Sequence, residues 1–323
     1  MSKPSPGMSV VDDYTPTSFN GESLAILRGT TVELLNIDSE RATLVAQVTV
    51  ASELRDLRVA VSGRSFVGHD PSYTSVWRWE RDADVSVLAT RSSPRDFVAG
   101  DLVTVDGTDY TLLQQHQRLD VLDGETLIAR ANVGPPRGLR CLRFVMLAGR
   151  RLAVLAMPVD DPTMTFVVVS WDTLLGDAAT IQTAMAAMAT PGNRVDDYAW
   201  FLEVGPAPGN AIIVARDNED TEEIEDREPG DIRWAHRGFY FMDLDTGAMR
   251  EPIPFTGSFE GTVGLCATEQ TIALHRRDAL VTISRQSGAV TEHTASAIAL
   301  DVANARVAMF DGTTWNVRSV DQL

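Results

Sequence analysis

The chain of 323 residues contains a single lysine, Lys3, and only two cysteines, Cys141 and Cys266. A phosphate-binding loop of the Gly-x-x-x-x-Gly-Lys-Ser/Thr type needs a lysine beside its glycines, so this class of nucleotide site is excluded. Two distant cysteines form neither a disulfide framework nor a zinc site, and we expect both to be small buried side chains. The use of arginine in place of lysine indicates a GC-rich, bacterial genome.

Long apolar runs and positive net charge are also missing. No apolar run approaches the roughly 18 residues of a membrane span, and the N-terminus has no signal-type apolar region. We therefore expect no membrane insertion and a cytoplasmic location. The formal net charge of −17 and the sequence pI of about 4.6 give a field that repels phosphate backbones and anionic lipids. Nucleic acid is for this reason an unfavoured partner.

Motifs of known catalytic or metal chemistry are absent too. The serine-hydrolase pattern Gly-x-Ser-x-Gly does not occur. The histidines never form a close pair at metal-ligand spacing; they are His69, His116, His236, His275 and His293. The sequence therefore assigns no catalytic, cofactor-binding or metal-binding residue, and we expect no cofactor.

What the chain does contain is a weak internal repeat. The run Thr165–Asp172 is an alternating apolar segment that ends in a bulky residue and an acid. Six similar endings occur at Ile37-Asp38, Trp79-Glu80, Leu122-Asp123, Leu244-Asp245, Arg285-Gln286 and Val320-Asp321. Five of the six spacings between successive endings lie between 35 and 49 residues, and the sixth, 73 residues, contains an insertion. One four-stranded propeller blade takes about 40 to 50 residues.

The spacing also closes on itself. Two residues follow Asp321, and 38 more from the N-terminus reach Asp38, which makes one further repeat of 40. The pattern predicts a single domain over 1–323, an all-β, seven-bladed β-propeller of four-stranded antiparallel blades. We expect shared N- and C-terminal strands to close the ring, with Ser9–Asp13 as the outer strand missing from the last repeat.

Individual strands follow this template unevenly. Asp106-Gly107 is a strong hairpin signal between Leu102–Val105 and Tyr110–Leu113. The segment Gln114–Arg118 has no place in the template.

The chain resembles the WD40-like and related bacterial seven-bladed β-propellers. The resemblance rests on Trp171-Asp172 and on the turns Asp245-Thr-Gly247 and Gln286-Ser-Gly288, each of which follows an apolar strand. It implies the propeller fold. Many such proteins are non-catalytic platforms for other proteins, whereas others are enzymes whose polar residues line the central channel.

Two segments exceed the template. Residues 174–188 form either a short helix, for which Asp177 is a suitable N-cap, or an outer strand. Residues 216–231 are too acidic for a core strand and predict a solvated loop. The glycine that an EF-hand needs at its sixth position is replaced by Glu222, which disfavours calcium binding.

The acidic loop is either a solubilising segment or a recognition element. As a recognition element it would attract a partner with a basic surface, and nearby aromatic side chains would supply anchor area. The candidate partner-binding residues are Asp217, Glu219, Asp220, Glu222, Glu223, Glu225, Asp226, Arg233, Trp234 and Trp200.

The sequence favours a non-enzymatic protein-binding platform, an adaptor or scaffold subunit in a bacterial multiprotein system. The alternative is an enzyme or small-ligand binder that uses polar residues at the channel mouth, such as Asp196 and Asp197. A structural subunit of a larger assembly is a third possibility.

Overall fold

The structure is a computed structural model with all side chains. It describes residues 17–38, 41–50, 54, 56–59, 65–69, 73–78, 86–92, 97–115, 118–124, 126–133, 139–147, 151–158, 164–176, 194–195, 201–216, 237–246, 248, 252–277 and 279–323. Within these residues the strands form seven antiparallel sheets, six with four strands and one with three. We name them A to G in chain order.

The first four sheets take up the N-terminal half of the chain. Sheet A consists of β1 (Thr17–Asn20), β2 (Ser23–Arg28), β3 (Thr31–Asp38) and β4 (Arg41–Thr49). Sheet B consists of β5 (Asp56–Val59), β6 (Ser65–His69), β7 (Tyr73–Arg78) and β8 (Ser86–Ser92). Sheet C consists of β9 (Phe97–Val105), β10 (Thr108–Gln115), β11 (Arg118–Asp123) and β12 (Ala129–Val133). Sheet D consists of β13 (Leu139–Leu147), β14 (Arg151–Pro158), β15 (Met164–Ser170) and β16 (Arg194–Val195).

The other three sheets complete the chain. Sheet E consists of β17 (Phe201–Ala207), β18 (Ala211–Arg216), β19 (Gly238–Asp243) and β20 (Ile253–Pro254). Sheet F consists of β21 (Thr262–Ala267), β22 (Thr271–Arg276), β23 (Leu280–Ser284) and β24 (Val290–His293). Sheet G consists of β25 (Ala297–Asp301), β26 (Arg306–Phe310) and β27 (Trp315–Ser319). Two short helices are α1 (Trp171–Gly176) and a 3-10 turn, η4 (Val320–Gln322).

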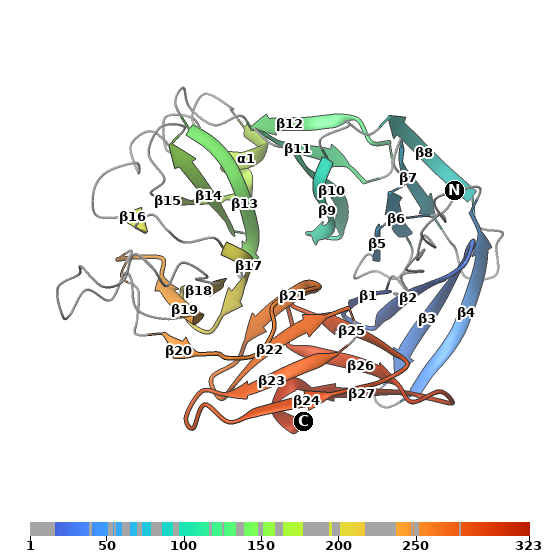
Figure 1. The fold of residues 1–323 in the computed structure, drawn as a ribbon. Helices are drawn as coiled ribbons and strands as arrows, with labels where there is room; N and C mark the ends of the chain where they lie inside the picture. The colour runs from blue at the N-terminus through green and yellow to red at the C-terminus, as the bar shows by residue number, and fades with distance from the viewer. Residues whose placement is uncertain are drawn as a thin grey trace, which may run out of the picture.

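The sheets stand around a common centre, and the first strand of each lies nearest to it (Figure 1). Each sheet contacts the next along the chain, and first strands meet directly where β5 contacts β1 and where β17 contacts β13 and β21. The protein is therefore an all-β propeller of small antiparallel sheets. Among the described residues, no helix has the length and apolar character that a membrane span requires.

The seven sequence endings mark the same place in every sheet. Asp38 and Asp123 are the last residues of β3 and β11, and the other five pairs begin directly after β7, β15, β19, β23 and β27. All seven are thus the ends of third strands, which confirms the phase of the repeat. The predicted turn at Asp106-Gly107 joins β9 to β10.

Three details of the template were wrong or incomplete. The segment 114–118 has a regular place, because Gln114 and Gln115 continue β10 and Arg118 opens β11. Trp171-Asp172 opens helix α1 instead of a turn, and the Trp171 side chain is buried with its ring 5.1 Å from that of Tyr110. The inner strand β1 was not predicted, because four residues are too few to show an alternating pattern.

The segment 174–188 is described only at its start. Residues 174–176 are helical, and the helix begins at Trp171, ahead of the cap predicted at Asp177. The fourth strand of sheet D is β16, which lies beyond residue 188. Residues 177–188 lie outside the described part of the chain, as does the proposed outer strand Ser9–Asp13.

Apolar side chains on both faces of sheets A and F pack against the neighbouring sheets. In β22, Ile272 and Leu274 join a cluster with sheet E, whereas Ala273 joins one with sheet G. Strands buried on two sides read as apolar runs, as the third strands β19 and β23 do. Cys266 is a free, buried cysteine in the cluster between sheets F and G, and burial raises the pKa of its thiol to about 12. The side chain of Cys141, on β13, is outside the described set.

The first and last sheets are also in contact. The Thr17 hydroxyl donates to the carbonyl of Ile298 at 2.6 Å, and the amide of Gly21 donates to the buried carboxylate of Asp301 at 2.8 Å. Arg306 donates to the carbonyl of Gly21 at 2.9 Å. Sheets A and G share a core cluster that includes Phe19 and Trp315. Residues nearly 300 positions apart are therefore joined by both polar and apolar contacts.

Candidate functional site

Three chain connections meet at one end of sheet E. The residues Phe201, Arg216, Gly238 and Pro254 pair in sequence across the four strands and form a single row. Residues 196–200 precede the row at Phe201, and residues 255–261 follow it at Pro254. Residues 217–237 connect Arg216 to Gly238. Consecutive Cα atoms are about 3.8 Å apart, so residues next to the row stay near it.

The candidate partner-binding residues belong to the two chain segments, 196–200 and 217–237, that adjoin this row in sequence. Asp217, Glu219, Asp220, Glu222, Glu223, Glu225, Asp226, Arg233, Trp234 and Trp200 lie outside the described residues, as do Asp196 and Asp197. Their chain neighbours are described: Trp200 directly precedes Phe201, and Asp217 directly follows Arg216. Topology thus brings the two attachment points, Phe201 and Arg216, 15 positions apart in sequence, to adjacent strands, which sequence spacing alone could not show.

The row rests on a cluster of three phenylalanines. Phe239, Phe255 and Phe259 are buried, with ring centroids 4.9 to 5.4 Å apart and tilted or edge-to-face geometry. The guanidinium of Arg237 lies 5.2 Å from the centre of the Phe259 ring. Such aromatic contacts are favourable beyond the area that they bury. The base of the acidic segment is therefore a firm platform.

Close backbone packing adds to this rigidity. At Gly238, where the acidic segment returns to the sheet, a Cβ atom would overlap the backbone oxygen of Ile253. At the other attachment point, Arg216 is 1% exposed, and its guanidinium lies 5.7 Å from the centre of the Tyr240 ring. Both ends of the segment are thus held by the core of sheet E.

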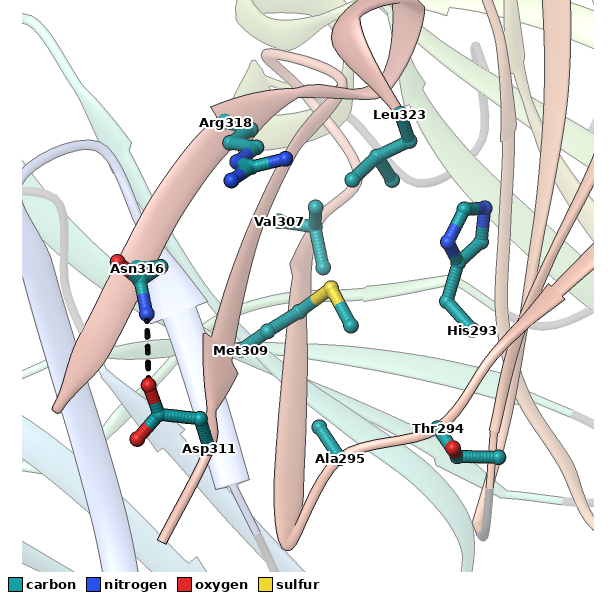
Figure 2. A pocket seen from close by; sticks show the side chains of 9 residues that line it. All are labelled: His293, Thr294, Ala295, Val307, Met309, Asp311, Asn316, Arg318 and Leu323. Carbon is teal, nitrogen blue, oxygen red and sulfur yellow. Dashed lines mark hydrogen bonds between the residues drawn. The ribbon is translucent and has the colours of Figure 1, made fainter. Parts of the chain in front are cut away.

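A second feature is a hollow of about 250 Å³ between sheets F and G. Figure 2 shows Val307 and Met309 at its centre, with Asn316 and Arg318 on one side and His293 on the other. In the pairing of β26 with β27, Arg318 stands opposite Val307 and Asn316 opposite Met309. These four side chains share one face of sheet G, which gives the hollow an apolar floor and a polar rim.

The polar groups around this hollow serve structural roles. The Asp311 carboxylate accepts hydrogen bonds from the backbone and hydroxyl groups of Thr313 and Thr314, and these hold its pKa well below the usual range. An acid this strong remains ionised and is a poor proton donor at neutral pH. His293 Nε2 lies 2.9 Å from the Thr282 hydroxyl, which is buried in β23. Asp311 and His293 are thus both engaged in hydrogen bonds within their own sheets.

His275, one of the five histidines, lies in the core. It is 5% exposed, and burial, aided by the positive charge of Arg58, lowers its pKa to about 4. The imidazole is consequently neutral at pH 7. Within the described part of the chain, no three His, Cys, Asp or Glu side chains are grouped so that they could hold a metal ion.

Comparison with known proteins identifies the fold but does not match the chain to a family. No protein-family profile matches the chain, and no curated protein matches it. Hydrazine synthase from Kuenenia stuttgartiensis is similar in structure over 98% of this chain and 99% of that chain, with 12% identity and a TM-score of 0.57. PorZ, an essential surface component of the type-IX secretion system of Porphyromonas gingivalis, is similar over 94% of this chain and 38% of that chain, with 9% identity and a TM-score of 0.52.

A third similar structure is the dihydro-heme d1 dehydrogenase NirN in complex with DHE. It matches 95% of this chain and 60% of that chain, with 11% identity and a TM-score of 0.51. At these identities the likeness establishes the propeller arrangement and nothing about the site.

Proposed function

We propose that the seven sheets are the blades of one closed, WD40-like propeller domain over residues 1–323. The contacts between sheets A and G support this proposal, because they join the two ends of the described chain by the same means that join neighbouring sheets. Spin labels on Thr30 and Thr313, exposed turn residues of sheets A and G, test it. A closed ring gives one narrow distance distribution, and a broad one would contradict closure.

We further propose that this propeller is a non-enzymatic protein-binding platform, an adaptor or scaffold subunit that acts in the bacterial cytoplasm. The observation that carries the proposal is the row at the end of sheet E, where the attachment points of the acidic segment and of Trp200 lie on adjacent strands over a rigid aromatic base. Such a base favours recognition, since order already present lowers the entropy cost of binding.

The chemistry of this site selects a basic protein partner. Acids at 217–226 would accelerate encounter with a positively charged surface, and Trp234 and Trp200 would supply anchor area once contact is made. The structural neighbours include both enzymes and a secretion-system component, so the fold itself does not choose between these roles.

Purification of the full chain with its native partners tests the proposal. In one variant the seven named acids of 217–226 become the matching amides, and in a second Trp200 and Trp234 become alanine. Both are expected to lose partner recovery. A control changes exposed acids elsewhere, Asp172 and Glu269, to amides and should retain it. Unchanged recovery with both site variants would remove the acidic segment from the proposal.

Salt dependence separates the two contributions. Because charge steers encounter and aromatic contact holds the complex, the amide variant should lose mainly association rate and its sensitivity to ionic strength. The tryptophan variant should instead dissociate faster. A partner whose association with the intact chain is insensitive to salt would contradict the proposed basic surface.

A further inference from the structure

The hollow between sheets F and G is an open extension of the core that these two sheets share. Val307 is fully buried in that core, and Ala295, Met309 and Leu323 pack against it while they remain partly exposed. All four line the hollow, whose volume is about 250 Å³. A cavity of roughly 150 Å³ can hold benzene, so the hollow has room for roughly ten non-hydrogen atoms. Its size and apolar floor suit a small ligand.

The other face of sheet G shows how a junction between two sheets is completed by side chains alone. There Phe310 and Trp315 pack against sheet A, with ring centroids 5.3 Å apart. The Arg28 guanidinium lies 5.5 Å from the centre of the Phe310 ring and forms an ion pair with Glu33 at 3.0 Å. The junction of sheets A and G thus combines an apolar surface, a cation above it and a carboxylate on that cation.

Arg318 is the corresponding cation beside the hollow, and it has no carboxylate. It is exposed on β27 and stands opposite Val307 in the strand pairing (Figure 2). Among the described residues its guanidinium forms neither an ion pair nor a hydrogen bond, although the chain has 45 aspartates and glutamates against 28 lysines and arginines. Asp311, at the rim of the hollow, is hydrogen-bonded to Thr313 and Thr314 instead.

A second donor lies beside Arg318 on the same face of β27. Asn316 is exposed and stands opposite Met309, and its amide nitrogen makes only long contacts, 3.4 Å to Asp311 and 3.5 Å to Thr314. Hydrogen bonds of this length are weak. The amide and the guanidinium can therefore both donate to a carboxylate above Met309, and such charge-assisted bonds are strong ones.

We propose that the hollow between sheets F and G binds an aliphatic monocarboxylate of about six to eight carbon atoms. The carboxylate pairs with Arg318 and accepts a hydrogen bond from Asn316, while the chain covers Met309 and Leu323. A neutral hydrocarbon would leave the guanidinium unpaired, and a short acid such as acetate would bury no chain. The site lies on sheets F and G and is separate from the acidic segment of sheet E.

Titration of the full-length protein with octanoate, followed by NMR of ¹³C-methyl methionine, locates the ligand. Met309 is one of ten methionines, and the loss of its signal in Met309→Leu identifies it. Octanoate should shift this signal saturably. Each methylene removed from the ligand should weaken binding by up to about fourfold, so that acetate has no measurable effect. A Met309 signal that does not move at millimolar octanoate would overturn the proposal.

The charge of the ligand is tested on the intact chain, where no substitution can disturb folding. Octanol has the same chain length as octanoate and carries no charge. It should bind about tenfold more weakly, because a hydrogen-bonded ion pair with Arg318 is lost. Equal affinities for the two ligands would show a purely apolar site and would reject the carboxylate.

Substitution of the arginine tests the same contact from the protein side. Arg318→Gln should weaken octanoate binding about tenfold and leave octanol binding unchanged, whereas Arg318→Lys should retain most of the octanoate affinity. The control Arg130→Gln removes an exposed arginine of sheet C and should affect neither ligand. Octanoate binding that Arg318→Gln does not weaken would place the ligand elsewhere and overturn the proposal.

Discussion

Sheets E and G depart from the four-stranded repeat in opposite ways. Sheet E has four strands and a long insertion between β18 and β19, whereas sheet G has three described strands and a hollow on one face. Yet the core at the end of sheet E is closed by Phe239, Phe255 and Phe259, all at most 5% exposed. An insertion at a strand end leaves blade packing intact, whereas in sheet G, as far as the described residues show, apolar side chains such as Met309 are partly uncovered.

The largest effect is expected in the closed core of sheet E. Phe239→Ala removes a ring that contacts both Phe255 and Phe259 and should lower the free energy of unfolding by about 3–5 kcal/mol. Urea denaturation followed by tryptophan fluorescence measures it. If Phe239→Ala lowered the free energy of unfolding by less than Met309→Ala does, the proposed difference in packing between sheets E and G would be contradicted.

The next effect is a pH dependence at the junction of sheets F and G, where His275 lies in β22. Its pKa is about 4 in the folded protein and near its ordinary value of 6.5 when unfolded. The unfolded chain therefore binds the extra proton, and stability present above pH 6.5 is lost as pH falls toward 4, on the order of 3 kcal/mol. Denaturation of the protein and of His275→Leu at several pH values measures the difference. Parallel pH profiles would contradict it.

A smaller effect is expected where sheets E and F meet near the centre. A Cβ atom at Gly205, on β17, would overlap the backbone oxygen of Leu265 on β21. Gly205→Ala should therefore cost about 1–3 kcal/mol through displaced strands. Gly264→Ala is the matched control, because the nearest atom to its Cβ would be at an ordinary 3.6 Å. Equal Tm values for the two variants would show that the close contact does not limit packing.

The smallest effect is expected in the hollow beside sheet G. Met309 is only half-buried, so Met309→Ala should lower the free energy of unfolding by about 1 kcal/mol. The same denaturation assay applies. A loss as large as that of Phe239→Ala would contradict the weak packing expected around Met309.

The repeat was readable because the third strands carry apolar runs, and two of them, β19 and β23, are buried along nearly their whole length. Apolar runs such as Phe166–Val169 remain visible without any tertiary information. The short inner strand β1 and the two-residue strands β16 and β20 left no such signal. Trp171 matched the repeat, but its helix depends on contacts with β12 and Tyr110 that no local pattern contains.

Sequence by itself determined the phase of the repeat, the all-β class and the places where insertions occur, because these depend on local periodicity and on chain length. Tertiary structure decided which distant residues meet. Strand pairing places the neighbours of Trp200 and Asp217 in one row and Arg318 opposite Val307 beside the hollow. Packing of the sheets buries His275, so that its imidazole is neutral. Burial and electrostatic environment are properties of packed sheets, and a linear chain specifies them only through its fold.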